Sequence, residues 1–343
     1  MTYVIANGKL PGRRKRRLHM TQQNEQWRRP IRALVRGWKD IQRLRIQVGG
    51  RIVANRKVQL GQEPGKREKE LSSEAKKILA DLRAEHKRIT DAFAGQRASY
   101  ATFHGTDLIP SYTDMCLVEE YVTLVREEKK HLDSLEEMLP QHPIYNEFLK
   151  DIRGIGPAIS AVLISEIDIS KAQYPSSLWS FSGLAVESDG RGTSRRKEHL
   201  RDIPYTDRHG KEKVRKGLVF NPLMKDMLLG IMVPCLIRAG NEKYCKIYRD
   251  YKHRLENHPT YGIANDTARV KAAAEEGYML SPKLHRDNMS KRYLAKSFLL
   301  TLYLAWRTIE WLPVSKPYHE SKLGVVHHGG NDSVPSVQGE QVA

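Results

Sequence analysis

Apolar residues recur at intervals of three and four positions along much of this chain, a spacing that places them on one face of an α-helix. The first such stripe consists of Trp27, Ile31, Leu34, Trp38 and Ile41. Two further stripes, over 71–93 and 117–139, come close to the heptad spacing of paired helices. No repeated strand-then-helix pattern occurs, so the sequence predicts a mainly α fold.

Prolines and glycines suggest where these helices begin and end. We expect the first long helix to begin near Pro30 and to be interrupted or ended by Gly49-Gly50. A polar linker follows it. The stripes over 71–93 and 117–139 are expected to form two helices that pair as an antiparallel hairpin or coiled coil.

The pattern divides the chain into four segments. A basic arm and arginine-rich helix occupy 1–60, the helical hairpin 61–150, and a helical domain 151–316. The tail, 317–343, is rich in Gly, Ser and His and is expected to be disordered. Between 114 and 137, eight acidic residues stand against three basic ones, so this helix is expected to face protein or solvent.

Positive charge is concentrated near the start of the chain. The whole sequence has 58 Lys and Arg against 40 Asp and Glu, but residues 1–60 hold sixteen basic and two acidic side chains. Such a local excess favours a polyanionic partner, DNA or RNA, over an ordinary solvated surface. The residues expected to contact nucleic acid here are Arg13, Arg14, Lys15, Arg16, Arg17, Arg28, Arg29, Arg32, Arg36, Lys39 and Arg43.

Several classes of protein are disfavoured by composition. The three cysteines form no CxxC pair, and no Cys/His cluster has zinc-ligand spacing, so no disulfide framework and no metal site is expected. No Walker or Rossmann glycine loop is present, and no cofactor is indicated. Without an apolar run of membrane-spanning length or a secretory signal, we expect a cytoplasmic, nucleoid-associated protein that does not contact the membrane.

The segment Arg153–Pro157 (RGIGP) lies between a short helix and a helix rich in small apolar residues. It reads as a helix-hairpin-helix, in which the N–H groups around Gly154, Ile155 and Gly156 approach a phosphate and the next helix adds its positive end. Such a loop contacts nucleic acid without reading its sequence. The alternative is that the two glycines only turn the chain.

A basic, turn-rich stretch follows. Ten Lys and Arg stand against four Asp and Glu over 191–217, and part of this stretch, around 205–211, has the pattern of a β-hairpin. The fold prediction is therefore helical with one small irregular or β-hairpin insertion. Further nucleic-acid contacts are expected from Arg191, Arg195, Arg196 and Lys197.

Serine nucleophiles are conceivable in the same stretch, at Ser188 and at Thr193-Ser194. A serine in a glycine-rich loop is far more often a turn residue than a nucleophile. The sequence identifies no general base beside either position. His209, His253 and His285 are scattered and are interpreted as surface or core residues.

The order of these features resembles the C-terminal half of a known transposase family. The landmarks are IRGIG at 152–156, FSGL at 181–184 and ESDG at 187–190, between a helical hairpin and terminal helices. The family is that of the insertion-sequence transposases known as bridge-RNA-guided recombinases, which join a RuvC-like nuclease domain with four carboxylates to a helical domain that bears a serine. The resemblance covers roughly 112–312 and, more faintly, 34–52.

The resemblance implies a function in DNA transposition or recombination. Ser188 would then attack a DNA phosphodiester and form a covalent phosphoserine link. The nuclease half has no counterpart in this sequence, so Mg²⁺ and its carboxylates would come from a partner nuclease. The other implied partners are DNA, a structured guide-like RNA and further copies of the chain.

Two other hypotheses stay open beside this one. The chain could be a non-catalytic, domesticated relative that keeps only the surfaces for nucleic-acid binding and self-association. It could also be a scaffold whose basic arm folds on structured RNA.

Overall fold

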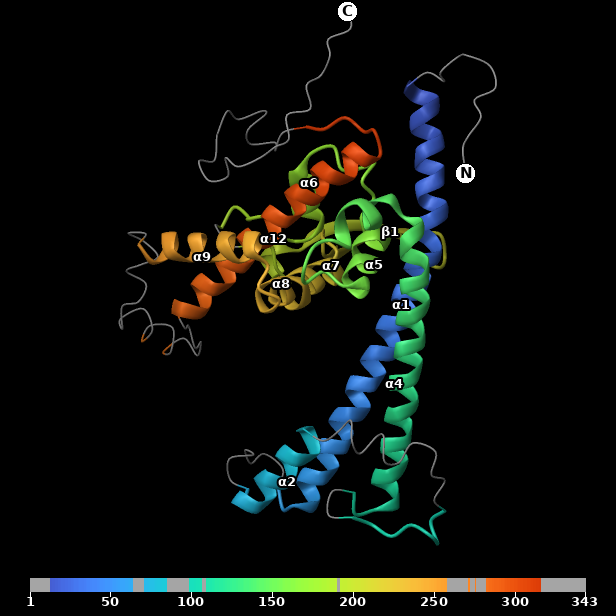
Figure 1. Cartoon of the computed structure of the whole chain (residues 1–343), viewed down its shortest axis with the longest axis vertical. Coiled ribbons are helices and arrows are strands. Elements are labelled where there is room, and N and C mark those ends of the chain that lie inside the picture. Colours follow the sequence, from blue (N-terminus) through green and yellow to red (C-terminus); the bar gives the residue numbers. More distant parts are fainter. Residues whose placement is uncertain are drawn as a thin grey trace, which may run out of the picture. The chain divides into compact units, whose positions relative to one another are not determined.

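A computed structural model describes residues 13–63, 71–84, 99–106, 109–189, 192–257, 271, 275 and 282–315, with side chains from Arg28 onward except at 83–84 and 282–283. This part of the chain is mainly helical and contains one two-stranded sheet, which confirms the prediction of a mainly α fold (Figure 1). None of its helices is both long enough and apolar enough to cross a membrane. The tail beyond 315 and the start of the basic arm lie outside the described residues.

The chain divides into two compact units, Gln22–Gln141 and the remainder. The first is dominated by α1 (Arg13–Gln59) and α4 (Tyr112–Met138), with the short helix α2 (Ser73–Ala84) between them in sequence. The predicted segments separated the arginine-rich helix (1–60) from the helical hairpin (61–150). In the structure, α1 from Gln22 onward lies in the same unit as α4.

Helix α1 is longer and less interrupted than predicted. It runs through Pro30 and through Gly49-Gly50, so the prediction of a start near Pro30 and a break at the glycines is wrong. A proline inside a helix removes one N–H donor and its ring crowds the carbonyl four residues earlier, yet α1 continues past Pro30. At Gly49 the missing side chain makes room for the ring of Tyr121, since a Cβ there would lie 3.2 Å from Cε2 of that ring.

The antiparallel partner of α4 is α1, and not the helix that begins near residue 71. Gly37 faces His131, Gly49 faces Tyr121, and the Gln59 side chain donates a 2.8 Å hydrogen bond to Asp114 near the opposite end of α4. Within the described residues, the pairing predicted between the stripes over 71–93 and 117–139 is therefore replaced by a pairing of α4 with the longer helix α1. Residues 85–98 lie outside the described part of the chain.

The role of α2 is to cover one end of this helical pair. Its residue Leu82 joins the cluster formed by Val48 and Ile52 of α1 with Val118 and Val122 of α4. A second small cluster lies beside it and consists of Leu71, Ala75 and Leu79, packed against Val53 and Leu60. The described part of this apolar stripe, from Leu71 to Leu82, is thus buried against residues of both α1 and α4.

The acidic side of α4 is used for pairing with α1. Glu128 accepts hydrogen bonds from Arg45 and, at 3.0 Å, from the side-chain amide of Gln42. Arg45 also donates a 3.1 Å bond to the hydroxyl of Tyr121. Part of the positive charge of α1 is therefore neutralised within the protein, as expected for an acidic helix that faces protein.

The second unit is built around α12 (Pro282–Ile309). This helix packs against α9 (Glu242–Glu256), α6 (Pro175–Phe181) and α8 (Val233–Arg238). Its buried face consists of Leu294, Ala295, Phe298, Leu299, Leu302 and Tyr303, all with no exposed surface. Helix α5 (Pro157–Glu166), the small-residue helix after the RGIGP segment, is buried from Ile159 to its end.

Short helical pieces complete this unit. A π-helix (Tyr145–Leu149) precedes the RGIGP segment, and α7 (Pro222–Asp226) leads through a second π-helix (Met227–Met232) into α8. The helical stretch that begins at Pro222 is divided again by Gly240, whose φ of +66° separates α8 from α9. A side chain other than glycine rarely adopts that conformation.

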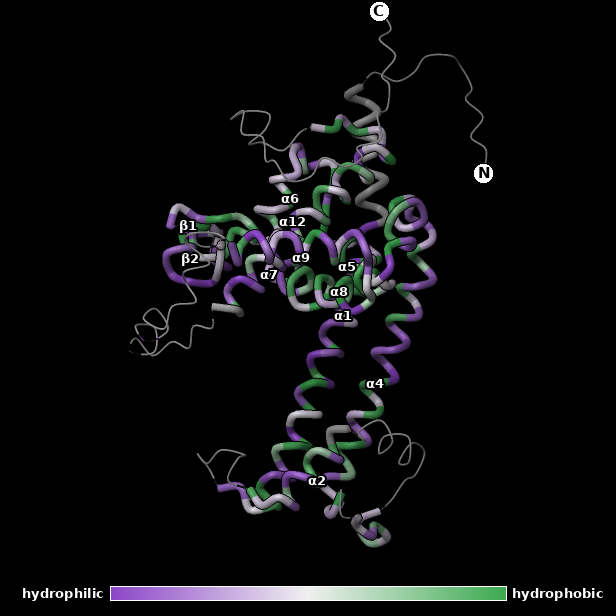
Figure 2. The backbone as a smooth tube through the Cα atoms, turned by 60° about the vertical axis from the view of Figure 1, so that its left-hand side comes forward, coloured by the Kyte–Doolittle hydropathy of each residue, from purple (hydrophilic) through white to green (hydrophobic). Residues whose placement is uncertain are grey.

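The predicted β-hairpin is present, with β1 (Arg201–Thr206) antiparallel to β2 (Glu212–Gly217). In Figure 2 the two strands project from the helices of this unit. Asp207 organises the turn, because one carboxylate oxygen accepts from the N–H groups of His209 at 2.8 Å and Lys211 at 3.0 Å. The other pairs with Lys213 at 2.8 Å. The Lys213 contact, followed by the two N–H bonds, lowers the pKa of Asp207.

The two glycines of the RGIGP segment have different surroundings. Gly154 has a φ of +100°, and a Cβ there would lie 3.0 Å from the Cys235 carbonyl oxygen and from Cα of Leu236 in α8. Gly156 caps α5 with a φ of −91°, and nothing lies within 4 Å of its Cβ position. Gly154 is thus needed for the turn and the packing, whereas Gly156 faces open space.

Substitution of each glycine by alanine tests this difference. Gly154→Ala should lower the free energy of unfolding by about 1–3 kcal/mol, because alanine is strained at that φ and meets α8. Gly156→Ala should lower it by less than about 1 kcal/mol, the effect of a poorer N-cap. Urea denaturation followed by circular dichroism measures both, and equal losses would contradict the assigned roles.

The turn of the β-hairpin should respond to acid. Since the pKa of folded Asp207 lies below the usual value of 3.8, its stabilising contribution is complete above pH 3.8 and is lost as the pH falls through the lower folded value. The amide resonances of His209 and Lys211 should therefore shift only below that pH. Asp207→Asn provides the control, and a shift at higher pH would contradict the assignment.

Candidate active site between α6 and β1

The loop that follows α6 folds back on itself. Gly183, with a φ of +64°, turns the chain closely around the ring of Phe220, and Val186 then forms an antiparallel bridge with Gly192. The Thr193 N–H donates a 3.0 Å bond to the carbonyl of Ala185. This closure brings the residues just after Val186 close to those just after Gly192, and residues 190–191 at its tip lie outside the described part.

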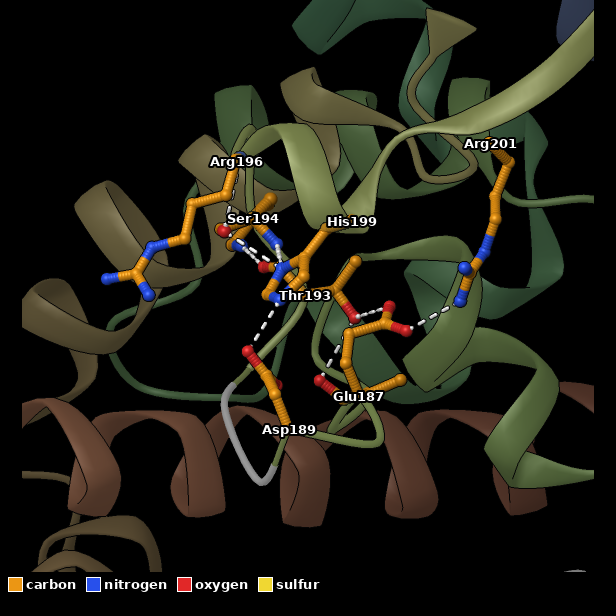
Figure 3. A network of polar contacts seen from close by, with 9 residues as sticks. Glu187, Asp189, Thr193, Ser194, Arg196, His199 and Arg201 are labelled. Carbon is orange, nitrogen blue, oxygen red and sulfur yellow. Dashed lines mark hydrogen bonds and ion pairs between the residues drawn. The ribbon is translucent and has the colours of Figure 1, made fainter.

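A serine, a histidine and an aspartate are connected in this loop (Figure 3). The hydroxyl of Ser194 lies 2.9 Å from Nδ1 of His199, and Nε2 of the same ring lies 3.1 Å from a carboxylate oxygen of Asp189. His199 ends a short 3₁₀ turn (Lys197–His199) and is 3% exposed. We call these three residues the Ser194 relay.

The backbone determines the direction of the relay. The N–H of Ser194 also contacts Nδ1 of His199, at 3.0 Å, and an N–H group can only donate. Nδ1 is therefore the acceptor nitrogen, so the ring hydrogen is on Nε2 and is donated to Asp189. The Ser194 hydroxyl in turn donates to Nδ1.

This arrangement is suited to nucleophilic chemistry. A serine hydroxyl becomes a nucleophile when a neighbouring base accepts its proton, and a carboxylate on the far ring nitrogen orients that base and stabilises its charged form. Here His199 is placed as the base and Asp189 as the orienting group. Ser194 is only half-buried.

A second network of hydrogen bonds, centred on Glu187 and Thr193, holds the two sides of the loop together. One carboxylate oxygen of Glu187 lies 3.0 Å from the Thr193 hydroxyl, and the other accepts a 2.9 Å bond from Arg201 at the start of β1. The ammonium group of Lys225 in α7 donates to the carbonyl of Thr193. Thr193 is thus held from three sides, which fixes the backbone immediately before Ser194.

Cationic side chains from α7 and α12 gather around the same backbone. The Arg292 guanidinium lies so close to Gly192 that any side chain there would collide with it. Burial lowers the pKa of Arg292, and burial followed by repulsion from Arg292 lowers the pKa of both Lys225 and Lys296. We call Lys225, Arg292 and Lys296 the cation cluster.

The cation cluster has few anions of its own. Arg292 makes neither a hydrogen bond nor an ion pair with any described residue, and Lys296 lies 5.6 Å from the ring centre of Trp179. The nearby carboxylate of Asp226 is 3.8 Å from Arg195. Partly buried cations with few carboxylates around them are suited to a phosphate, which a guanidinium binds with two parallel hydrogen bonds.

The predicted nucleophile, Ser188, lies in the same loop but outside the relay. It is exposed in the turn between Glu187 and Asp189 and forms no hydrogen bond with a described residue. The predicted contacts Arg195, Arg196 and Lys197 are also exposed near the relay, and Figure 3 shows Arg196 directed away from it. Arg191 lies outside the described residues.

His199 could not be singled out from the sequence as a neighbour of Ser194. In the structure this buried histidine contacts the Ser194 hydroxyl directly. The available signal was weak, namely Asp189, Ser194 and His199 at intervals of five residues. Such a spacing matches no regular element, and only the closure of the loop brings the three side chains together.

The other predicted contacts lie apart from this loop in sequence and differ in exposure. On α1, Arg28 is buried, and burial lowers the pKa of Lys39 despite the nearby Glu128. Arg29, Arg36 and Arg43 are exposed, Arg32 is half-buried, and the side chains of Arg13, Arg14, Lys15, Arg16 and Arg17 lie outside the described part. Exposed arginines on α1 therefore remain candidates for phosphate contact.

The RGIGP segment is partly occupied by protein contacts. Ile155 is buried, and the side chain of Asn241 donates a 3.0 Å bond to the Arg153 carbonyl. A shallow depression beside it contains both acidic and basic side chains, Asp151, Arg153, Glu242 and Lys243. Phosphate binding by this loop remains a prediction, with Gly156 as its open position.

Within the described residues, no three His, Cys, Asp or Glu side chains converge as a metal site. Comparisons of the whole chain with protein-family models, curated proteins and solved structures found no match. The geometry of the loop is therefore the main evidence on function.

The direction of the relay can be measured directly. In protein labelled with ¹⁵N-histidine, neutral His199 should show the Nε2–H tautomer, because the Ser194 N–H requires an acceptor at Nδ1. Asp189→Asn preserves the shape and removes the charge, so it should disturb the Nε2 signal. Observation of the Nδ1–H tautomer in the unmodified protein would contradict the arrangement.

Proposed function

We propose that this chain is a nucleic-acid-binding, transposase-related protein and that Ser194 is the nucleophile through which it acts on DNA. The observation that carries the proposal is the Ser194 relay, with its 2.9 Å contact between the serine hydroxyl and His199. The resemblance of 112–312 to a transposase domain with a serine in this stretch supports the same reaction class. Ser194 replaces Ser188 as the favoured nucleophile because it has a base beside it.

The cation cluster makes a phosphodiester the preferred substrate. Esters and amides are neutral, whereas a backbone phosphate offers the anion that Arg292 lacks. The same cations would stabilise the additional negative charge on the phosphoryl oxygens in the transition state. Among them, Lys225 donates a hydrogen bond to the carbonyl of Thr193, the residue that precedes Ser194.

The proposed step is a transesterification. The Ser194 hydroxyl gives its proton to Nδ1 of His199 while its oxygen bonds to phosphorus, and the bond from phosphorus to one sugar oxygen breaks. The departing sugar oxygen takes the proton back from His199. Asp189 holds the ring throughout, and one phosphodiester is exchanged for a serine phosphodiester, with the departing strand released as an alcohol.

A second candidate function is binding without chemistry. The backbone N–H of Ser194 already uses Nδ1 of His199, so the same contacts would also fasten the loop around a buried ring. In that case the basic surfaces of α1 and of the loop would bind nucleic acid, and the serine would be a turn residue. This alternative corresponds to a domesticated relative of the transposases.

A covalent adduct with DNA separates the two functions. Mixed-sequence duplex DNA carrying a bridging sulfur in place of the leaving oxygen should yield protein-linked DNA that survives detergent. Ser194→Ala should abolish the adduct without loss of affinity, and Ser188→Ala is the matched control that retains it. His199→Gln should slow its formation by roughly 10²–10⁴-fold.

Other outcomes change the assignment. Loss of the adduct in Ser188→Ala alone would return the nucleophile to Ser188. If the unmodified protein bound DNA but formed no adduct, serine chemistry would be rejected and binding without chemistry would be the favoured function.

A further inference from the structure

The ribbon formed by β1 and β2 is exposed on both sides. Every strand residue except Ile203 and Gly217 is exposed, and no helix or second sheet covers the ribbon within the described part of the chain. A two-stranded hairpin that contributes so little to a core is only marginally stable without a partner. Its length and projection therefore require an explanation other than packing.

The register sorts the ribbon residues into two faces. Successive side chains point to opposite sides of a strand, and residues paired across the strands share a side. The pairs Arg201 with Gly217, Ile203 with Arg215, and Tyr205 with Lys213 make up what we call the cationic face. The opposite face consists of Asp202, Pro204, Thr206, Glu212, Val214 and Lys216.

Charge is distributed unequally between these faces. The cationic face holds three basic residues and no acidic one, whereas the opposite face holds both acidic strand residues and a single lysine. On the opposite face Lys216 is paired with Asp202 at 2.9 Å. A solvated ribbon has no need for this separation, but a ribbon that binds a polyanion on one side does.

The centre of the cationic face joins an arginine to an aromatic ring. The Arg215 guanidinium lies 5.4 Å from the ring centre of Tyr205, and that residue is 38% exposed. Arg215 makes no ion pair with a described residue, whereas Lys213 and Arg201 are held by Asp207 and Glu187 outside the strands. The ribbon thus presents the Arg215 guanidinium between two cations that are held in ion pairs.

We propose that the cationic face of the β1–β2 ribbon enters the major groove of duplex DNA. The major groove of B-form DNA, about 12 Å wide, admits a two-stranded ribbon, whereas that of duplex RNA is too narrow and deep. Arg215 at the centre would reach base edges or phosphates, and the tethered cations would lie along the backbone. The inference rests on the proposed binding of nucleic acid but not on serine chemistry.

The contact between Arg201 and Glu187 connects the proposed DNA-binding ribbon to the relay loop. The same Glu187 contacts Thr193, the neighbour of Ser194, so the ribbon base and the relay loop share one carboxylate. DNA held by the ribbon would therefore be anchored to the backbone that carries the nucleophile. The ribbon would act as a positioning element, without touching the reacting phosphate.

Adjacent residues on opposite faces provide a matched test. Arg215→Glu and Lys216→Glu change the charge equally at exposed neighbouring positions of β2. Binding of a mixed-sequence 30-base-pair DNA duplex should weaken roughly tenfold in Arg215→Glu, with a salt slope reduced by about 1. Lys216→Glu should bind within about twofold of the unmodified protein. Arg215→Gln repeats the test without a new negative charge, and circular dichroism confirms folding.

The possible outcomes separate this inference from the proposed function. Equal effects of the two substitutions, with DNA still bound by the unmodified protein, would overturn the ribbon inference alone. Equal affinity for a 30-base-pair RNA duplex with the same sensitivity to Arg215→Glu would also overturn it, because that groove cannot admit the ribbon. Failure of the unmodified protein to bind either duplex would overturn both.

Discussion

The buried face of α12 is the constraint on which the second unit depends. Beyond its apolar contacts, this helix holds the chain that leads to the relay loop by hydrogen bonds. The Tyr303 hydroxyl donates to the Gln173 carbonyl at 2.7 Å, and the Lys296 carbonyl accepts from the Trp179 indole at 3.1 Å. One turn earlier, Arg292 lies against Gly192. The relay loop is therefore supported by a long buried helix. The proposed catalytic side chains need such support to be held in a fixed geometry.

The helical content and the β-hairpin were predictable because each is encoded locally, by apolar period and by turn residues. The continuity of α1 was not, since local rules assign breaks to proline and paired glycines. Whether such a residue ends a helix depends on its neighbours in space, as the ring of Tyr121 over Gly49 illustrates. The partner of α4 was missed for the same reason, because periodicity identifies a buried face but not what buries it.

The candidate site was predictable only in its location. Sequence and resemblance both pointed to the stretch between Glu187 and Lys197, where serine, glycine and basic residues concentrate. The selection of Ser194 over Ser188 needed the position of His199, which depends on the bridge between Val186 and Gly192. The cation cluster joins Lys225 to residues about seventy positions further along the chain, a separation over which no spacing argument applies.

The contact between Gly192 and Arg292 has an evolutionary consequence. A Cβ at residue 192 would lie 1.5 Å from Nη1 of Arg292, so a side chain there would displace the guanidinium from its place beside the loop. In relatives of this protein the two positions should vary together, with loss of the glycine accompanied by a smaller residue on α12. Such paired variation would distinguish lineages that keep the cation cluster from lineages that have abandoned it.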